Sequence, residues 1–370
     1  MSDVVFVDSA DLSPFPDWDN LLVQTDSQEL ISNVSTRVRL VRAGDLTLPI
    51  TVNDAELENS WVCSPYNGAV TYPLEELRLI RSRLLRGALR ATALSSGRLL
   101  KAGLINRVVC VNNRLLSTNL YPQLRPKQIA ALIELLVQEY PGHAILFRSL
   151  NTETNSGLIS CLQEFGCLMA PSRQVYFYDG RKADYLNRSD TRRDLRLLRR
   201  TRFRLLSPDR MAEADPDRVR DLYRLLYVDK YSAHNPQFTS RLIECWLASG
   251  SMRVFGLVTE HGRLDGVVGS WIMDGVRTVP LVGYDTAQPQ STGLYRMLMA
   301  QVLEETAQRN EILNLSAGAA HFKRLRGGRP VLESSAVYCR HLGLRQRMTW
   351  RMLAMLLNRI GRPILQKLEL

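Results

Sequence analysis

The chain has 370 residues and a formal net charge of +11, from 48 Lys and Arg against 37 Asp and Glu. Its length predicts roughly two or three domains, and apolar residues at 45% are enough to build large cores. The positive charge favours a polyanionic partner, such as nucleic acid, an anionic membrane face or a phosphorylated cofactor, and does not choose among the three.

The six cysteines are scattered, without a Cys-x-x-Cys pair. They are expected to be reduced thiols in a cytoplasmic protein, so neither a disulfide framework nor a metal site is predicted. Residues 1–16 lack the basic and apolar regions of a signal peptide. No apolar run reaches about 18 residues, so no membrane-spanning helix is expected.

In the first half, residues 37–51 alternate enough to predict a hairpin that turns at Ala43-Gly44-Asp45. Residues 73–94 predict one amphipathic helix, because apolar residues recur at three- and four-residue spacing. The following elements are a hairpin or long strand at 106–120, a helix at 125–139, a strand at 143–150, a helix at 156–165 and a strand at 174–178.

In the second half, residues 190–206 predict a basic helix, interpreted as a linker, with a polyanion site such as one for RNA as the alternative. Helices at 216–227 and 238–248 precede strands at 253–259, 264–273 and 276–284, and then a helix at 292–308, a strand at 312–315, a short helix at 321–325 and a strand at 335–339. Residues 345–368 form an amphipathic helical stretch, which either packs on its own domain or lies on an anionic membrane face.

Residues 106–178 and 276–339 share the order strand, helix, strand, helix, strand, without a residue-level repeat. This order predicts a mixed α/β (α+β) fold built twice, each copy a mixed twisted sheet flanked by helices. The expected organisation is a lead-in at 1–35, an N-terminal domain at 36–182, the basic linker at 183–207, a C-terminal domain at 208–343 and an amphipathic helix at 344–370.

The most informative stretch follows the strand at 276–284. A turn rich in helix breakers leads directly into a helix, so backbone N–H groups and the positive end of a helix lie at the carboxyl end of a strand. Such a place binds phosphate without a cationic side chain. The last residues of this turn and the first residues of the helix are Gln290, Ser291, Thr292, Gly293, Leu294 and Tyr295. In the alternative interpretation, Gly293 only permits a tight turn and Ser291 or Thr292 caps the helix.

Two segments resemble the Gcn5-related N-acetyltransferases (GNAT), and within them the tandem group that includes Fem-type aminoacyltransferases and acetyltransferases linked to cellulose biosynthesis. Gln290-Ser-Thr-Gly293-Leu-Tyr295 resembles the pyrophosphate loop Gln/Arg-x-x-Gly-x-Gly/Ala, with Tyr295 in place of the last small residue. Residues 320–331, with Phe322-Lys323 and Gly327-Gly328, are similar to the Phe-Lys…Gly-Gly segment of Fem-type sequences. The first half resembles the fold by element order alone, which implies a degenerate copy without the cofactor.

The resemblance implies direct transfer of an acyl group from acetyl-CoA or a longer acyl-CoA to an amine, with backbone N–H groups of residues 276–284 near the acyl carbonyl. Lys323 would then stabilise an oxyanion or anchor an anionic acceptor, and its alternative is a solvated helix lysine. Asp285 or Tyr284 would remove the amine proton, although Asp285 could cap the turn instead. His321 is a further catalytic candidate or a structural residue, and Tyr338 could protonate the departing thiolate or be a packing residue.

Three functions stay open. The first is an N-acyltransferase that uses an acyl-CoA and a small-molecule or peptide-like amine acceptor. The second is a Fem-type enzyme that uses aminoacyl-tRNA. The third is a non-catalytic basic adaptor that binds nucleic acid or an anionic membrane surface through residues 191–204 and the C-terminal helix. The expected location is the cytoplasm, with peripheral contact to the inner face of the membrane through that helix.

Overall fold

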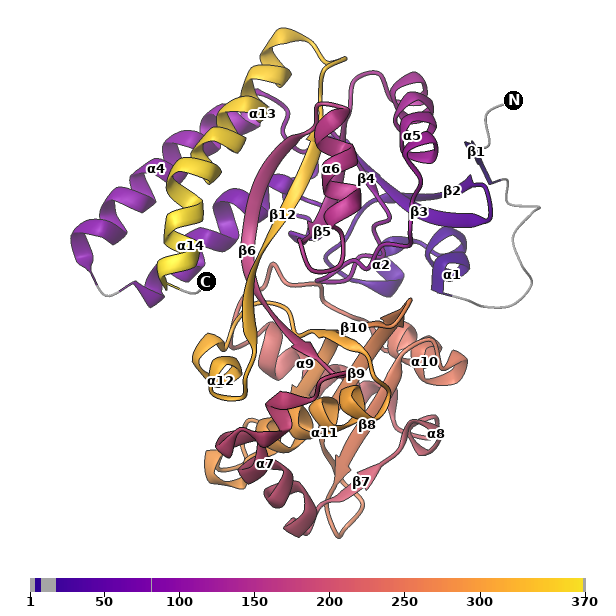
Figure 1. Ribbon diagram of the computed structural model, residues 1–370, viewed down its shortest axis with the longest axis vertical. Coiled ribbons are helices and arrows are strands. Elements are labelled where there is room, and N and C mark those ends of the chain that lie inside the picture. The colour runs from indigo at the N-terminus through magenta and orange to yellow at the C-terminus, as the bar shows by residue number, and fades with distance from the viewer. Residues whose placement is uncertain (1–3, 8–17, 81, 369–370) are drawn as a thin grey trace. The chain divides into compact units, whose positions relative to one another are not determined.

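The computed structural model describes residues 4–7, 18–80 and 82–368 of the chain (Figure 1). The chain forms two compact units. Unit 1 consists of Met1–Arg173, His234–Pro236 and Leu332–Leu368, and unit 2 contains Gln174–Ala233 and Gln237–Val331. Both have the mixed α/β architecture that the sequence predicts, with sheets flanked by helices.

Unit 1 contains β1 (Val4–Phe6), α1 (Trp18–Gln24), α2 (Ser27–Leu30), β2 (Arg37–Ala43), β3 (Leu46–Asn53), α3 (Tyr72–Glu76), α4 (Arg83–Ala102), β4 (Val108–Val111), α5 (Pro126–Glu139), β5 (Ala144–Leu150), α6 (Ser156–Glu164), α13 (Leu344–Leu356) and α14 (Arg362–Leu368). Unit 2 contains α7 (Ser189–Arg200), β7 (Arg204–Leu206), α8 (Pro208–Met211), α9 (Pro216–Tyr227), α10 (Ser240–Ser249), β8 (Arg253–Val258), β9 (Leu264–Met273), β10 (Val276–Tyr284), α11 (Leu294–Gln308), β11 (Ile312–Asn314) and α12 (Ala320–Leu325). The strands β6 (Leu168–Asp179) and β12 (Arg329–Tyr338) supply residues to both units.

The sheet of unit 1 has the strand order β1-β2-β3-β4-β5-β12-β6, and β4 runs parallel to β5. Alternate residues of these two central strands enter different hydrophobic clusters. Val109 and Phe147 pack in the cluster that includes α5 and α6, whereas Cys110 and Leu146 pack in the cluster that includes α4 and α13. Both faces of the parallel pair are therefore buried, as is usual for parallel strands.

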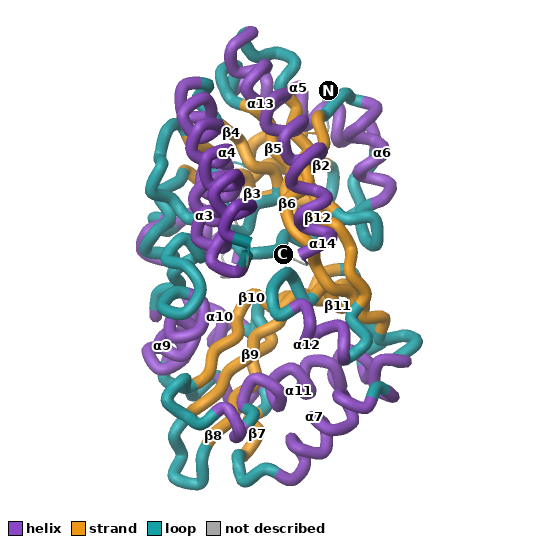
Figure 2. The backbone as a smooth tube through the Cα atoms, turned by 90° about the vertical axis from the view of Figure 1, so that its left-hand side faces the viewer, coloured by secondary structure: helices purple, strands orange, loops and turns teal. Residues whose placement is uncertain are grey.

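The sheet of unit 2 has the order β6-β11-β10-β9-β8-β7, in which β10 and β11 are parallel. Helix α11 packs on this sheet, and α7 lies beside α11 (Figure 2). Helix α9 also packs on β10. A Cβ atom on Gly283 would clash with the backbone of Leu222 and Tyr223, so only glycine allows this approach of helix and strand.

The repeated element order is confirmed, since β4-α5-β5-α6-β6 corresponds to β10-α11-β11-α12-β12. Three predicted elements are wrong in part. The helix predicted at 190–206 ends at Arg200, and Arg204–Leu206 form the strand β7, which pairs with β8. The helix predicted at 73–94 is interrupted, because Ile80 is extended and Ser82 caps a new helix, α4, by accepting a hydrogen bond from the N–H of Leu85. The hairpin or long strand at 106–120 ends at β4, because Asn112 has a φ of 53° and the buried Asn113 side chain bonds Thr51 and the Val62 carbonyl.

The compact units differ from the expected domain ranges. The basic helix expected as a linker at 183–207 is α7, and it belongs to unit 2. Its buried Asp194 accepts hydrogen bonds from Arg296 and Arg326, each at 2.6 Å, and these bonds hold α7 against α11 and α12. The C-terminal end of β12 belongs to unit 1. In the expected lead-in at 1–35, the described residues form β1, α1 and α2, and residues 1–3 and 8–17 lie outside the described residues.

A buried ion-pair network joins three elements of unit 2. Arg277 on β10 is fully buried and donates to Glu305 of α11 at 2.7 Å and to Glu311, which precedes β11, at 2.6 Å. Glu305 also pairs with Arg253, and Glu311 with Arg309 at 3.1 Å. The network fixes the start of β10 to the start of β11, where the parallel pairing occurs.

Replacing Arg277 by Ala should lower the free energy of unfolding by about 3 kcal/mol, because two buried carboxylates lose their shared partner. Urea titration measures the change. Arg181→Ala is the matched control, since the Arg181–Asp179 pair lies at the surface, where ion pairs contribute little to stability, and its loss should cost much less than the loss of Arg277. Equal costs for the two variants would show that the buried network does not stabilise the fold.

Candidate functional site

The parallel strands β10 and β11 separate shortly after they begin. Their pairing involves Val276, Arg277 and Thr278 of β10, and the described residues give β10 no further partner on β11. Pro280 lacks an N–H group, and the β10–β9 register shifts between Thr278 and Leu281. After Asn314 the chain follows β6 instead, because the N–H of Leu315 donates to the Tyr176 carbonyl at 2.9 Å. In the described residues, β10 from Val279 to Tyr284 therefore has no strand partner on the β11 side, and this unpaired edge is called here the opening between β10 and β11.

Thr278 lies at the point where the two strands separate. Its side chain is fully buried, and its hydroxyl has no hydrogen-bond partner among the described residues. A buried hydroxyl without a partner costs free energy unless a ligand or water satisfies it. Analysis of the sequence did not find Thr278, although Pro280 in a predicted central strand was a signal of irregular pairing at this position.

The predicted phosphate loop lies at the carboxyl end of β10. Gln290–Thr292 form a single 3₁₀ turn, Gly293 has a φ of 74°, and α11 begins at Leu294. Gln290 and Ser291 are exposed, and neither Ser291 nor Thr292 caps the helix through its side chain. The first N–H groups of α11 have no carbonyl partner within the helix. A Cβ atom on Gly293 would also lie 2.7 Å from Leu197 of α7, so a larger residue here would disturb the fold as well as any ligand.

Tyr295, which replaces the small residue of the family motif, packs in an aromatic cluster. Its ring centroid lies 6.2 Å from that of Tyr284 and 4.9 Å from that of Phe322. Burial raises the pKa of Tyr295 well above its ordinary value, and nearby tyrosine hydroxyls act in the same direction. Tyr284 and Tyr295 thus form an apolar wall at the end of β10, and the Tyr295 hydroxyl is a poor source of an anion.

Asp285 orders the turn after β10. Its carboxylate accepts hydrogen bonds from Arg218 at 3.0 Å and from the N–H of Ala287 at 3.0 Å. Burial alone would raise the pKa of Asp285, but Arg218, the Ala287 N–H and Arg263 together hold it below its ordinary value. A carboxylate of low pKa is a weak proton acceptor. The geometry therefore matches the turn-capping alternative.

Lys323 is buried, so the alternative of a solvated helix lysine is wrong. Its ammonium donates to the carbonyls of Leu315 at 2.7 Å, Ser316 at 3.1 Å and Ala317 at 2.8 Å. These three bonds use the three N–H donors of the ammonium. The cation fixes the turn that follows β11, on one side of the opening between the strands.

Replacing Lys323 by Met should lower the free energy of unfolding by about 2 kcal/mol, because three carbonyls lose their donor. Chemical denaturation measures this change, with Lys182→Met at an exposed position as the control. A Lys323→Met protein of unchanged stability but without turnover would instead make the ammonium a reacting group.

The remaining predicted side chains lie on different units. His321 is exposed on α12 of unit 2, next to Phe322, and the described residues give it no hydrogen-bond partner. Tyr338 belongs to unit 1, where it pairs with Ile145 of β5 and its ring stacks on His341 at 5.6 Å between centroids. The stacking of Tyr338 is the packing arrangement that the sequence analysis named as its alternative.

In unit 1, the helix that corresponds to α11 is α5, and its N-terminus is partly capped. The N–H of Arg125, which precedes α5, donates to the Gln128 side chain at 2.8 Å, and the same side chain donates to the Ala43 carbonyl at 2.8 Å. Pro126 at the first position of α5 has no N–H to offer. The N-terminus of α5 therefore presents fewer free donors than that of α11.

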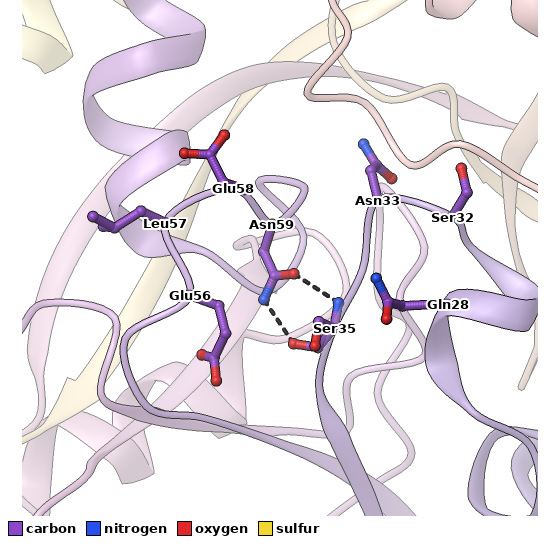
Figure 3. Close-up of a pocket in the computed structure, with 8 residues that line it drawn as sticks. All are labelled: Gln28, Ser32, Asn33, Ser35, Glu56, Leu57, Glu58 and Asn59. Carbon is purple, nitrogen blue, oxygen red and sulfur yellow. Dashed lines mark hydrogen bonds between the residues drawn. The ribbon is translucent and has the colours of Figure 1, made fainter.

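A pocket of about 380 Å³ lies in unit 1. Figure 3 shows the residues that line it. Reciprocal hydrogen bonds between Ser35 and the Asn59 amide, at 2.7 and 2.8 Å, link the two chain segments beside it. The lining residues are Gln28, Ser32, Asn33, Ser35, Glu56, Leu57, Glu58 and Asn59. None of the side chains predicted from the sequence lines this pocket. Among the described residues, no group of His, Cys, Asp and Glu is arranged to hold a metal ion, and no helix is long and apolar enough to cross a bilayer.

No protein-family model and no curated protein match the chain. Solved structures are similar to it. The C-terminal domain (DUF2156) of a putative lysylphosphatidylglycerol synthetase from Agrobacterium fabrum is 15% identical over 63% of this chain and 79% of that chain, with a TM-score of 0.46. FemX is 7% identical over 62% and 80% of the two chains, with a TM-score of 0.46. A GCN5-related N-acetyltransferase from Kribbella flavida is 14% identical over 62% and 80%, with a TM-score of 0.34. The solved neighbours thus include the GNAT and Fem-type groups that the sequence resembles.

Proposed function

We propose that the protein is an N-acyltransferase that moves an acyl group from acetyl-CoA or another acyl-CoA to an amine. The observation that carries the proposal is the opening between β10 and β11, with the N-terminus of α11 at its end. The N–H groups of Thr292 and Gly293 already donate to the carbonyls of Pro289 and Gln290, so in this proposal the N–H groups of Leu294 and Tyr295, in the first turn of α11, bind the diphosphate of the donor. The thioester lies along the open edge of β10, near the unpaired Thr278 hydroxyl.

In this proposal the amine nitrogen attacks the thioester carbonyl carbon, the C–S bond breaks, and the amine proton is lost while the departing thiolate gains one. Backbone N–H groups of β10 stabilise the negative charge on the carbonyl oxygen. His321 accepts the amine proton, since Asp285 is held as an anion of low basicity by Arg218. Lys323 positions the turn after β11 rather than touching the reacting atoms.

The variant Ser291→Glu, which places a negative charge at an exposed position beside the N-terminus of α11, tests whether the donor binds there. A glutamate there should leave the stability unchanged or slightly raise it, because an anion at a helix N-terminus is favourable. It should weaken acetyl-CoA binding by roughly tenfold through repulsion of the diphosphate. Isothermal titration calorimetry with acetyl-CoA and longer acyl-CoAs measures the affinity.

Gln308→Glu makes the same change at the opposite, exposed end of α11, and it should leave donor affinity unchanged. No binding of any acyl-CoA by the folded wild-type protein would end the acyl-CoA proposal. Equal affinities of the Ser291→Glu and Gln308→Glu variants would remove the α11 N-terminus from it.

Aminoacyl-tRNA is the second candidate donor, favoured by the exposed arginines on and after α7. Seven arginines are exposed there, at positions 192, 193, 196, 199, 200, 202 and 204, and of these Arg193 and Arg199 pair with carboxylates. If tRNA is the donor, amine acylation by the protein with charged tRNA should be abolished by RNase and should fall steeply with salt. Turnover with purified acyl-CoA in the presence of RNase would exclude this candidate. No turnover with either donor, together with salt-dependent RNA binding, would favour the non-catalytic adaptor.

A further inference from the structure

Two helical segments of unit 1 contain no acidic residue. Residues 77–133 include α4, residues 334–368 include α13 and α14, and neither range has an Asp or a Glu. Their cations are Arg83, Arg86, Arg90, Arg98 and Lys101 on α4, and Arg345, Arg347, Arg351, Arg359, Arg362 and Lys367 on α13 to α14. No carboxylate of the described residues pairs with any of them. These helices therefore carry a concentrated positive charge without internal neutralisation.

The same helices carry most of the exposed apolar side chains. The described residues include thirteen large apolar side chains that are exposed, and nine of them lie in these two segments. The nine are Leu84, Leu85, Leu94, Leu99, Leu104, Leu344, Met348, Met355 and Ile360. Leu84 is the most exposed of them, at 90%. Such a concentration of apolar side chains marks an interaction surface.

Helix α4 has two different apolar stripes. Leu100 faces the core of unit 1, where it packs in one cluster with Trp350 and Leu353 of α13. Leu84, Ala88 and Leu99 recur at helical spacing on the side away from Leu100, and all three are exposed. Figure 1 shows α4 and α13 side by side. The outer apolar stripe of α4 is therefore not needed for the contact with the core and remains exposed.

Cations and exposed aliphatic side chains together favour one kind of partner. Nucleic acid would use the arginines but would leave the leucines and methionines in water. A second copy of the chain would bring the same positive charge to the interface and be repelled. An anionic bilayer uses both, because cations contact the headgroups while aliphatic side chains enter the headgroup–acyl boundary.

We propose that α4 and α13 to α14 form a face, here called the basic apolar face, that binds the surface of a bilayer containing anionic phospholipids. The face extends the membrane contact expected of the C-terminal helix to a second helix, α4, which the sequence analysis did not associate with membranes. The proposal is independent of the acyl donor, because it concerns unit 1 and uses none of the residues assigned to the transfer reaction.

The experiment is co-sedimentation of the full chain with vesicles. Vesicles of phosphatidylcholine with about one third phosphatidylglycerol should bind the protein, and pure phosphatidylcholine vesicles should bind it at least about tenfold more weakly. Raising NaCl from about 0.05 M to about 0.5 M should release much of the bound protein through screening. The double variant Leu84→Gln/Leu99→Gln should bind about tenfold or more weakly than wild type, because two aliphatic side chains no longer enter the bilayer.

A second double variant, Arg83→Gln/Arg90→Gln, tests the charge and should bind roughly tenfold more weakly. The matched controls are Val5→Gln and Arg42→Gln, at exposed positions of β1 and β2, and both should bind like wild type. All substituted side chains are exposed, and circular dichroism confirms that each variant folds. No binding to the anionic vesicles, or equal binding by wild type and both double variants, would overturn the proposal. Concentration-dependent dimerisation that Leu84→Gln/Leu99→Gln abolishes, without vesicle binding, would assign the face to a second copy instead.

Discussion

The arrangement of unit 2 depends on the buried guanidinium of Arg277. Arg277 on β10 binds Glu311, which precedes β11, and Glu305, which lies on α11. These two contacts fix the first residues of β10 and β11 side by side and hold α11 against them. Burying three charges is expensive, so the network is stable only while all of its partners are present. Beyond Thr278 no further pairs join β10 to β11 in the described residues, and the register between β10 and β9 shifts around Pro280, which lacks an N–H group. The opening thus begins where the pairing fixed by Arg277 ends and β10 becomes irregular.

The residues around this opening have different roles from those their types alone would indicate. Lys323 and Asp285, which carry formal charges, hold turns in place through carbonyls, an arginine and a backbone N–H. Neutral groups lie near the same strand: the buried Thr278 hydroxyl, which has no hydrogen-bond partner among the described residues, and the packed rings of Tyr284 and Tyr295.

Much of the fold could be predicted from the sequence, because hydrophobic periodicity and breakers act locally. The bounds of α9, β9 and β10 agree with the predicted ranges, and Gly293 has the positive φ expected of the turn before α11. Long-range contacts could not be read in this way. The pairing of Asp194 with Arg296 and Arg326 and the close approach of α9 at Gly283 join residues far apart in the chain. The break at Ile80 was missed because apolar spacing continued across it.

The strands that supply residues to both units, β6 and β12, affect how the chain folds during synthesis. In unit 1, β5 lies between β4 and the end of β12, and β12 is made only after the whole of α11 and α12. Until then one edge of β5 has unpaired backbone groups, although β1 to β5 of unit 1 have already been made. Vectorial synthesis therefore leaves the amino-terminal sheet incomplete until the last strand arrives, and it ties the completion of one unit to the synthesis of the other.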